Sequence, residues 1–233
     1  MHKLMRQFQR GFTLIELLIV VAVMAVLLLL TLPAFLDIGR GSKMESAVSQ
    51  LNTTINLARQ WAITKRQPVY LVLPDDHIPM YSGINTNHFN KALRSYAVYV
   101  RGIGYVTEWK YLPQGIYFLD QQQSNNDDFK SVFKDKVKSN NNALRMNTIE
   151  QLPFPESNSA TKNINAIVFY PDGRVKSQDV SPFELYLGEA TKLDSRGADP
   201  VKFVWRENPV LRAIEINKWT GLTRVIDFSQ VAN

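Results

Sequence analysis

The chain contains no cysteine and only three histidines among its 233 residues. Without cysteine it can form no disulfide, no thiolate metal site and no cysteine nucleophile. The sequence also lacks the G-x-S-x-G, P-loop and Rossmann glycine patterns that mark common catalytic and nucleotide-binding sites. We therefore expect no enzymatic activity and no cofactor.

Oxygen and imidazole ligands for a metal are few and poorly spaced. Asp75, Asp76 and His77 are adjacent in "PDDHIP", and neighbouring residues rarely converge on one metal ion. The run 125–128 (NNDD) lacks the ligand spacing of a calcium loop. We interpret both stretches as polar loops and expect no metal site, although the sequence leaves a calcium site undecided.

The formal net charge of +6 is concentrated at the amino terminus. Lys3, Arg6 and Arg10 precede Gly11, and a chain cut after Gly11 keeps 24 basic against 21 acidic residues. Nucleic-acid binding needs basic side chains clustered on one face. Candidates lie only in the last part of the chain: Arg206, Arg212, Lys218 and Arg224, with Trp205 and Trp219. We consider a nucleic-acid partner unlikely and interpret these charges as ordinary solvated residues.

A long apolar segment follows the basic residues. Residues 17–30 are uniformly apolar, and 12–36 is about 25 residues, enough to cross roughly 30 Å of hydrocarbon as a helix. Basic residues before the segment and few just after it predict a cytoplasmic amino terminus. Three interpretations compete: a plain signal anchor, a secretory signal cleaved after the apolar run, and a segment cleaved before it. No A-x-A pattern follows the run, which disfavours the second.

Glu16 favours cleavage before the apolar run. An ionised side chain in a membrane helix costs free energy and is by default a functional residue whose partner should be named. A cut between Gly11 and Phe12 creates an α-amino group at Phe12, and Glu16 becomes the fifth residue of the mature chain. We therefore interpret Glu16 as a carboxylate that neutralises this amine, on its own chain or on a neighbouring subunit.

"GFTLIELLIVVAVMAVL" resembles the class III signal of type IV pilins and pseudopilins. The resemblance implies that prepilin peptidase cleaves after Gly11 and methylates the amine of Phe12, and that Glu16 guides assembly into a filament. Pro33 fits the proline that often kinks such helices, since proline breaks helical hydrogen bonding. Alternatively, Pro33 marks only the end of the membrane span.

A second helical pattern follows. Gly39 and Gly41 predict a kink or a short loosened turn. Beyond them, apolar residues recur at three- and four-residue spacing and predict an amphipathic helix that ends near Arg66, before Pro68. The predicted buried stripe consists of Met44, Ala47, Val48, Leu51, Ile55, Ala58 and Ala62.

The rest of the chain predicts short strands in a mainly antiparallel arrangement. The predicted strands are 68–73, 95–100, 105–112, 115–119, 164–170, 174–177, 183–187, 211–216 and 222–228, the last two forming a hairpin. Residues 120–163 are polar and predict an inserted loop, with a possible short helix at 129–138. Residues 193–200 predict a second loop.

Three stretches resemble the GspH/FimT family of minor pseudopilins and minor pilins. They are "INLARQWAITKRQPVYLVL" at the helix-to-strand junction, "VFYPDGRV" in the middle and "IEINKWTGLTRV" near the end. The resemblance does not include the asparagine-rich insertion. DNA-binding relatives would carry paired arginines after the closing glycine, where this chain has only Arg224.

Together these features predict an α+β, pilin-like fold. Its parts are a leader (1–11), a transmembrane half-helix (12–36), an amphipathic half-helix (37–66), and a β-rich periplasmic domain (67–233) with a polar insertion at about 120–163. The resemblance implies a minor pseudopilin of type II secretion in the bacterial inner membrane, with prepilin peptidase and other pilin-like subunits as partners. The alternatives are a type IV pilus minor pilin, including a DNA-uptake form, and an anchored periplasmic domain that never polymerises.

Overall fold

A computed structural model describes residues 13–76, 78, 86–119, 148–176, 183–193, 203–206 and 209–228. For residues 30–40 and 86–87 it describes the backbone alone. The chain divides into two compact units, Met1–Ser42 and Lys43–Asn233. Gly11 and Phe12, and the short helix expected at 129–138, lie outside the described residues.

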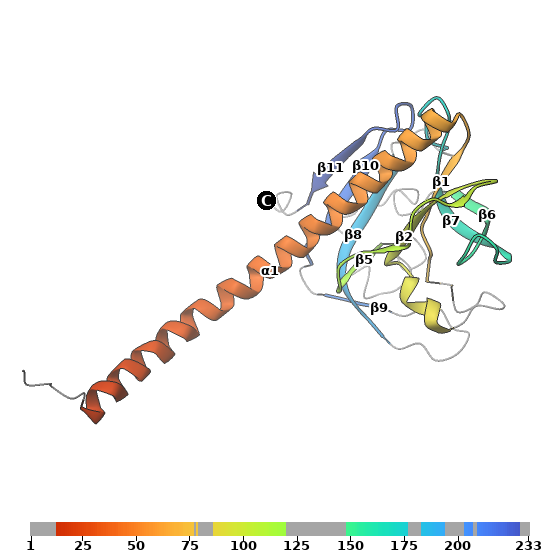
Figure 1. Ribbon diagram of the computed structural model, residues 1–233. Helices are drawn as coiled ribbons and strands as arrows, with labels where there is room; N and C mark the ends of the chain where they lie inside the picture. The colour runs from red at the N-terminus through yellow and green to blue at the C-terminus, as the bar shows by residue number, and fades with distance from the viewer. Residues whose placement is uncertain are drawn as a thin grey trace, which may run out of the picture. The chain divides into compact units, whose positions relative to one another are not determined.

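One helix, α1 (Leu14–Lys65, 52 residues), contributes to both units (Figure 1). Its backbone stays α-helical through Pro33, Gly39 and Gly41. The short loosened turn, one of the two outcomes expected at the glycines, is therefore wrong, while a kink at the glycines or at Pro33 remains a prediction. An internal glycine costs only about 1 kcal/mol relative to alanine, which is less than the cost of leaving backbone groups unpaired.

The carboxyl-terminal half of α1 supplies one face of the core of the second unit. All seven residues of the predicted stripe are at most 3% exposed. The 3.6-residue period places these side chains on one side of the helix, where they pack against the sheets. Polar residues between them anchor the helix as well: Lys110 Nζ donates to Thr54 Oγ1 at 3.2 Å, and Thr223 Oγ1 bonds Asn52 Oδ1.

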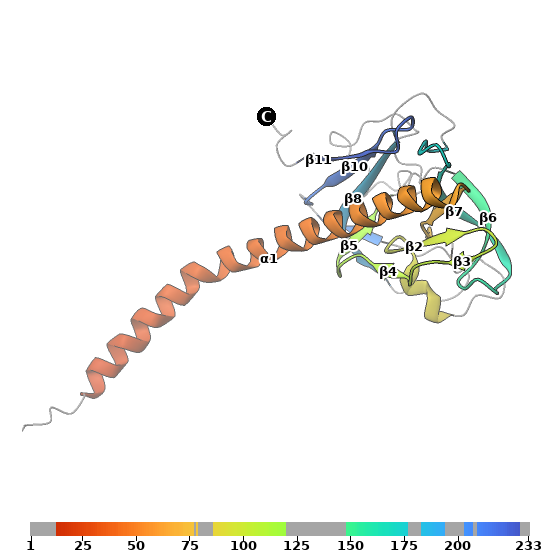
Figure 2. The same cartoon turned by 45° about the horizontal axis from the view of Figure 1, so that its top comes forward.

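Two antiparallel sheets complete the second unit. The first has the order β3-β2-β1-β7-β6, with β4 also paired to β2, and the second has the order β11-β10-β8-β5, with β9 also paired to β8. Figure 2 shows β10 and β11 alongside the carboxyl-terminal half of α1. The strands are β1 (Val69–Val72), β2 (Ser95–Val100), β3 (Gly104–Tyr105), β4 (Lys110–Tyr111), β5 (Ile116–Phe118), β6 (Thr148–Pro153), β7 (Thr161–Phe169), β8 (Phe183–Lys192), β9 (Phe203–Trp205), β10 (Arg212–Ile216) and β11 (Thr223–Asp227), and a 3₁₀ helix, η2 (Thr86–Lys91), precedes β2.

The α+β fold class and the antiparallel pairing are confirmed, including the final hairpin between β10 and β11. The loop expected throughout 120–163 is wrong where β6 and the first residues of β7 pair, from Thr148↔Ala166 to Pro153↔Thr161. In β6 only Thr148 and Leu152 are buried and Ile149 is exposed, so the strand lacks the apolar-in, polar-out alternation that predicts a strand. The strand expected at 105–112 is reduced to β3 and β4, and the one at 174–177 to an isolated bridge between Phe169 and Val175.

Candidate processing and assembly site

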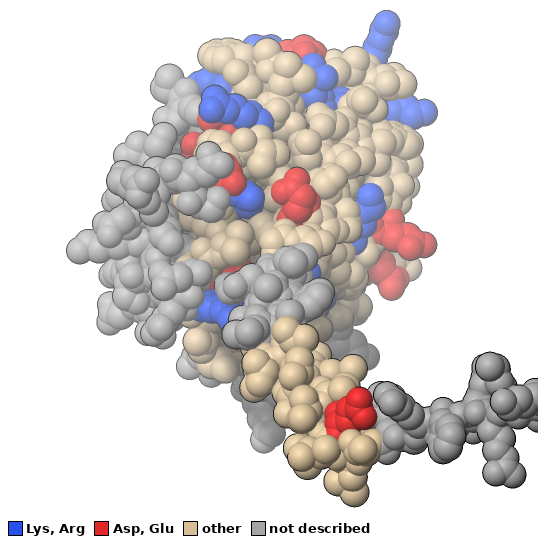
Figure 3. All heavy atoms as spheres, turned by 90° about the vertical axis from the view of Figure 1, so that its left-hand side faces the viewer, with Lys and Arg blue, Asp and Glu red and all other residues tan. Residues whose placement is uncertain are grey.

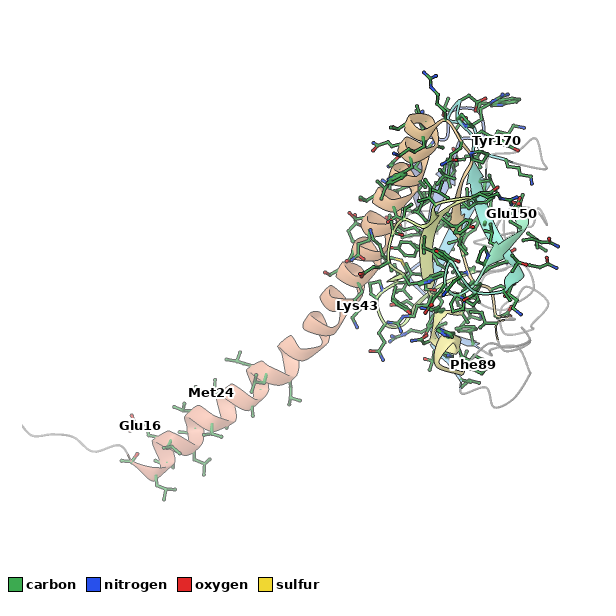
Figure 4. The ribbon with its side chains drawn as sticks, turned by 45° about the vertical axis from the view of Figure 1, so that its right-hand side comes forward. Glu16, Met24, Lys43, Phe89, Glu150 and Tyr170 are labelled. Carbon is green, nitrogen blue, oxygen red and sulfur yellow. The ribbon has the colours of Figure 1, made fainter. Side chains whose placement is uncertain are left out.

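The start of α1 carries the T-x-x-E sequence of a capping box. Thr13 precedes the helix, and its Oγ1 accepts a hydrogen bond from the backbone N–H of Glu16 at 3.3 Å. Threonine at the N-cap and glutamate three residues later is the pattern that satisfies the unpaired N–H groups of a helix start. A carboxylate in the first turn also interacts favourably with the helix dipole. Figure 4 shows Glu16 at this end of α1.

The backbone N–H of Glu16 thus takes part in a helix cap that the sequence analysis missed. The T-x-x-E pattern before the apolar run was the available signal. The cap and the proposed amine partner are compatible, because the cap uses the backbone N–H of Glu16 and the proposed pair uses its carboxylate. Cleavage after Gly11 and methylation of Phe12 remain predictions.

The described side chains of the first unit form an exposed apolar surface. Residues 13–29 are all exposed, and Glu16 is the only charged residue among them. Figure 3 shows one acidic side chain on this segment, whose other described side chains are uncharged. In the described part of the chain, no helix reaches the length and hydropathy required of a membrane span. An uninterrupted apolar surface of this kind marks a site that lipid or another protein covers.

A second cluster joins the three stretches that carried the family resemblance. Arg59, near the end of α1, donates a hydrogen bond from Nε to the carbonyl oxygen of Thr220 in the β10–β11 turn, at 2.6 Å. The amide of Val175 donates to the carbonyl oxygen of Lys218 at 2.8 Å. We call this contact between the end of α1, the Tyr170–Arg174 turn and the β10–β11 turn the α1–hairpin junction.

Two glycines permit the close approach at the junction. Gly221 has a φ of 64°, and a Cβ atom there would meet the carbonyl oxygen of Gly173 at a distance no real Cβ adopts. Gly173 has a φ of 81°, and a Cβ there would lie 3.2 Å from a guanidinium nitrogen of Arg59. Glycine is the residue that adopts positive φ without steric cost. The glycines in "PDGR" and "WTGL" are therefore required by packing as well as by turn geometry.

Charge in the junction is partly paired. Arg174 donates from Nε to Asp172 Oδ2 at 2.6 Å, and its backbone amide donates to Asp172 Oδ1 at 3.0 Å. The hydrogen bond from the Arg174 side chain is the main cause that lowers the pKa of the Asp172 carboxyl, and the same contact raises the pKa of Arg174. Both side chains are about half exposed, so the pair shapes the turn more than it stabilises the fold.

The residues considered for nucleic-acid binding do not share one surface. Trp205 is buried, and Arg212 forms an ion pair with Asp227. Of these candidates, Arg206, Trp219 and Arg224 are exposed and Lys218 is partly buried, and only Lys218, Trp219 and Arg224 belong to the final hairpin.

The carboxylates considered as metal ligands are buried. Asp75 Oδ2 accepts a hydrogen bond from Asn165 Nδ2 at 3.3 Å, and Asp76 is also buried, whereas His77 and residues 125–128 lie outside the described residues. Within the described ranges, no group of three histidine, cysteine or acidic residues could hold a metal ion.

Two models of known protein families match this chain. Residues 6–32 match the model of the prokaryotic N-terminal methylation motif. Residues 47–201, more than half of the chain, match the model of the type II transport protein GspH. Searches among curated proteins and among solved structures found no match.

The matched range contains the helix-to-strand junction and the "VFYPDGRV" stretch, and the final hairpin follows it. The two matches support a type II secretion pseudopilin or pilin-like role. The chain belongs to the GspH family of type II transport proteins and carries the N-terminal methylation motif at its start.

Proposed function

We propose that the protein is a minor pseudopilin of a type II secretion system. Prepilin peptidase cleaves the leader after Gly11 and methylates the amine of Phe12. The mature subunit then enters a short periplasmic filament with other pilin-like subunits, and the filament drives protein export. The chain is a substrate of processing enzymes and not itself an enzyme.

The observation that carries this proposal is the exposed apolar surface of residues 13–29 with a single carboxylate at its start. Burying such a surface between helices removes apolar area from water or from lipid contact, and the gain grows with the area covered. A helix that only anchored the protein would need no carboxylate at this position.

Glu16 supplies register in this proposal. Inside a helical bundle the dielectric constant is low, so an unpaired carboxylate would be costly and a nearby amine would be strongly attracted. The α-amine of Phe12, created by cleavage, is the partner that processing provides. Helices that slide out of register would lose this pair, and the correct register is therefore favoured.

The chain orientation follows from charge. Lys3, Arg6 and Arg10 precede the apolar segment, so the amino terminus stays in the cytoplasm. The second unit then faces the periplasm from a single-pass anchor in the bacterial inner membrane.

A type IV pilus minor pilin is the second candidate, because the methylation motif is not restricted to secretion pseudopilins. Gene neighbours distinguish the two: a secretion ATPase, a secretin and other pseudopilins for the first, and pilus retraction or competence genes for the second. A membrane-anchored periplasmic domain that never polymerises is the third candidate.

Substitution of Glu16 tests the proposal. Glu16→Ala removes the charge and the long side chain, whereas Glu16→Gln removes the charge and keeps a side chain that can complete a capping box. Both variants keep the backbone N–H that donates to Thr13 Oγ1. We expect both variants to insert and to be cleaved normally, and to be incorporated into sheared, sedimentable filaments at least tenfold less than the wild type. Glu45→Gln, an exposed residue of the same helix, is the matched control.

Normal incorporation of both variants would refute the pairing of Glu16 with an amine. Normal incorporation of Glu16→Gln alone would show that the Glu16 side chain acts through its size or its hydrogen bonding and not through its charge. Absence of the wild-type chain from all filaments would favour the anchored domain.

A further inference from the structure

Three large apolar side chains are exposed beside the α1–hairpin junction. Ile63 is 41% exposed, Trp219 64% and Leu222 55%. Ile63 lies at the end of α1, within reach of Gly173, and the other two flank the Thr220–Gly221 turn. We call these three residues the hairpin-tip surface.

The turn beneath this surface is held in one conformation. Asn217 Oδ1 accepts hydrogen bonds from the amides of Trp219 at 2.9 Å and Thr220 at 3.1 Å. The amide of Gly221 donates to the carbonyl oxygen of Asn217 at 2.7 Å. With the bond from Arg59 to Thr220, these contacts fix the backbone on both sides of the tryptophan. A fixed, exposed tryptophan loses little conformational entropy when it is buried by a partner, as is typical of interface anchors.

Several basic residues adjoin the hairpin-tip surface. Figure 3 shows Lys and Arg side chains, with acidic ones among them, at the top of the second unit. Two acidic residues also lie in this region. Asp172 is paired with Arg174, and Glu215 lies opposite Arg224 in the β10–β11 register, so each has a basic neighbour. The basic residues that adjoin the surface in sequence or contact its turn are Arg59, Lys65, Arg66, Lys218 and Arg224.

We propose that the hairpin-tip surface docks another pilin-like subunit, a different chain that presents an apolar pocket rimmed by carboxylates. The inference rests on the proposed function and names the surface and the chemistry of the partner. Trp219 fills the pocket, and the basic rim meets the carboxylates. Opposite charges at the rim select the partner and speed association, while the buried aromatic supplies most of the affinity.

A second copy of this chain does not fit the same surface. A two-fold contact brings the same patch of both subunits together. The basic rims would then face each other, and like charges across an interface are repulsive. The charge of this end therefore favours a different, acidic chain.

A nucleic acid fits the surface less well than a protein does. Lys218 Nζ lies 4.8 Å from the centre of the Trp219 ring, so one face of the ring is already covered by a cation. Bases stack on aromatic rings, and Ile63 and Leu222 are aliphatic. Burial in an apolar pocket uses all three side chains, whereas base stacking uses at most one.

Photo-crosslinking of the full chain in the membranes of its own host tests the inference. A p-benzoylphenylalanine residue is placed at Trp219 or, as the control, at Ile149 on β6, which is 70% exposed on the other sheet. We expect crosslinks from position 219 to a chain that carries its own methylation motif, at least tenfold more abundant than from position 149. Trp219→Ala should lower co-purification of that chain at least tenfold, and Ile149→Ala should leave it within twofold.

Three results would overturn the inference: equal crosslinking from positions 219 and 149, crosslinks from 219 to a second copy of this chain, or crosslinks to nucleic acid or lipid. If any of these occurs while the wild-type chain sediments with filaments, the inference fails and the proposed function stands. If the wild-type chain is absent from filaments, the proposed function itself fails.

Discussion

Arg59 and Thr220 are 161 residues apart in the sequence, and a 2.6 Å hydrogen bond from the guanidinium to the backbone carbonyl joins them. This bond connects the end of α1 to the turn of the final hairpin. Because that turn also packs on Gly173, one side chain links the three stretches that resemble the GspH/FimT family. The three resembling stretches therefore meet at the α1–hairpin junction.

Replacing Arg59 should weaken the second unit. Arg59→Met keeps the aliphatic stem and removes the donor, which leaves the Thr220 carbonyl without this bond. The expected loss in free energy of unfolding is about 0.5–1.5 kcal/mol, the usual net contribution of a hydrogen bond, because water can reach the exposed Thr220 carbonyl. Urea unfolding of the full chain in detergent measures it. The control Lys43→Met, at an exposed position, should change the free energy of unfolding by no more than about 0.5 kcal/mol. If Arg59→Met and Lys43→Met change it equally, the bond from Arg59 to Thr220 contributes nothing.

A methyl group at Gly221 should be more harmful than one at Gly115. Both residues have positive φ, 64° and 90°, so alanine is strained at either by about 1–2 kcal/mol. Nothing lies within 4 Å of a Cβ at Gly115, whereas a Cβ at Gly221 would collide with the Gly173 carbonyl and lie 3.0 Å from Arg59 Cδ. Gly221→Ala should therefore lower the free energy of unfolding by at least about 1 kcal/mol more than Gly115→Ala. Equal losses would mean that the junction is not tightly packed.

His88 should titrate below the ordinary histidine range. Burial lowers its pKa most, and the nearby Lys91 ammonium lowers it further. Because the folded pKa lies below the unfolded value of about 6.5, the stability from neutral His88 is fully present above pH 6.5. That stability is lost as the pH falls through the folded pKa.

Imidazole resonances in NMR spectra of the full chain in detergent measure this pKa, with His88→Gln for assignment. Lys91→Met should raise the pKa of His88, whereas Lys43→Met should not. A midpoint of 6.5 or higher in the wild type would contradict the prediction.

The parts of the fold that could be predicted from the sequence are those with a strong local period. The apolar stripe from Met44 to Ala62 follows the 3.6-residue repeat, and all of it is buried. Four of the six residues of the strand at Ser95–Val100 are valine or tyrosine, and the strand was predicted with its observed bounds.

The parts that could not be predicted depend on distant partners. The strand at Thr148–Pro153 is an edge strand without a regular apolar alternation, and its pairing with β7 defines it. The contact of Arg59 with Thr220 leaves no local pattern, since each residue lies in an ordinary helix end or turn. The helix cap at Thr13 did have a local signal, the T-x-x-E pattern. It was overlooked because Glu16 was interpreted as a docking charge within the apolar run.

The state of the amino terminus tests the central claim most directly. Intact-mass and amino-terminal peptide mass spectrometry should be performed on the protein purified from membranes of its own host. We predict a chain that begins at methylated Phe12, which places Glu16 fifth from a new amine. A chain that keeps Met1 through Gly11, or that is cut beyond Leu36, would contradict the processing, the pairing of Glu16 and the assembly that depends on both.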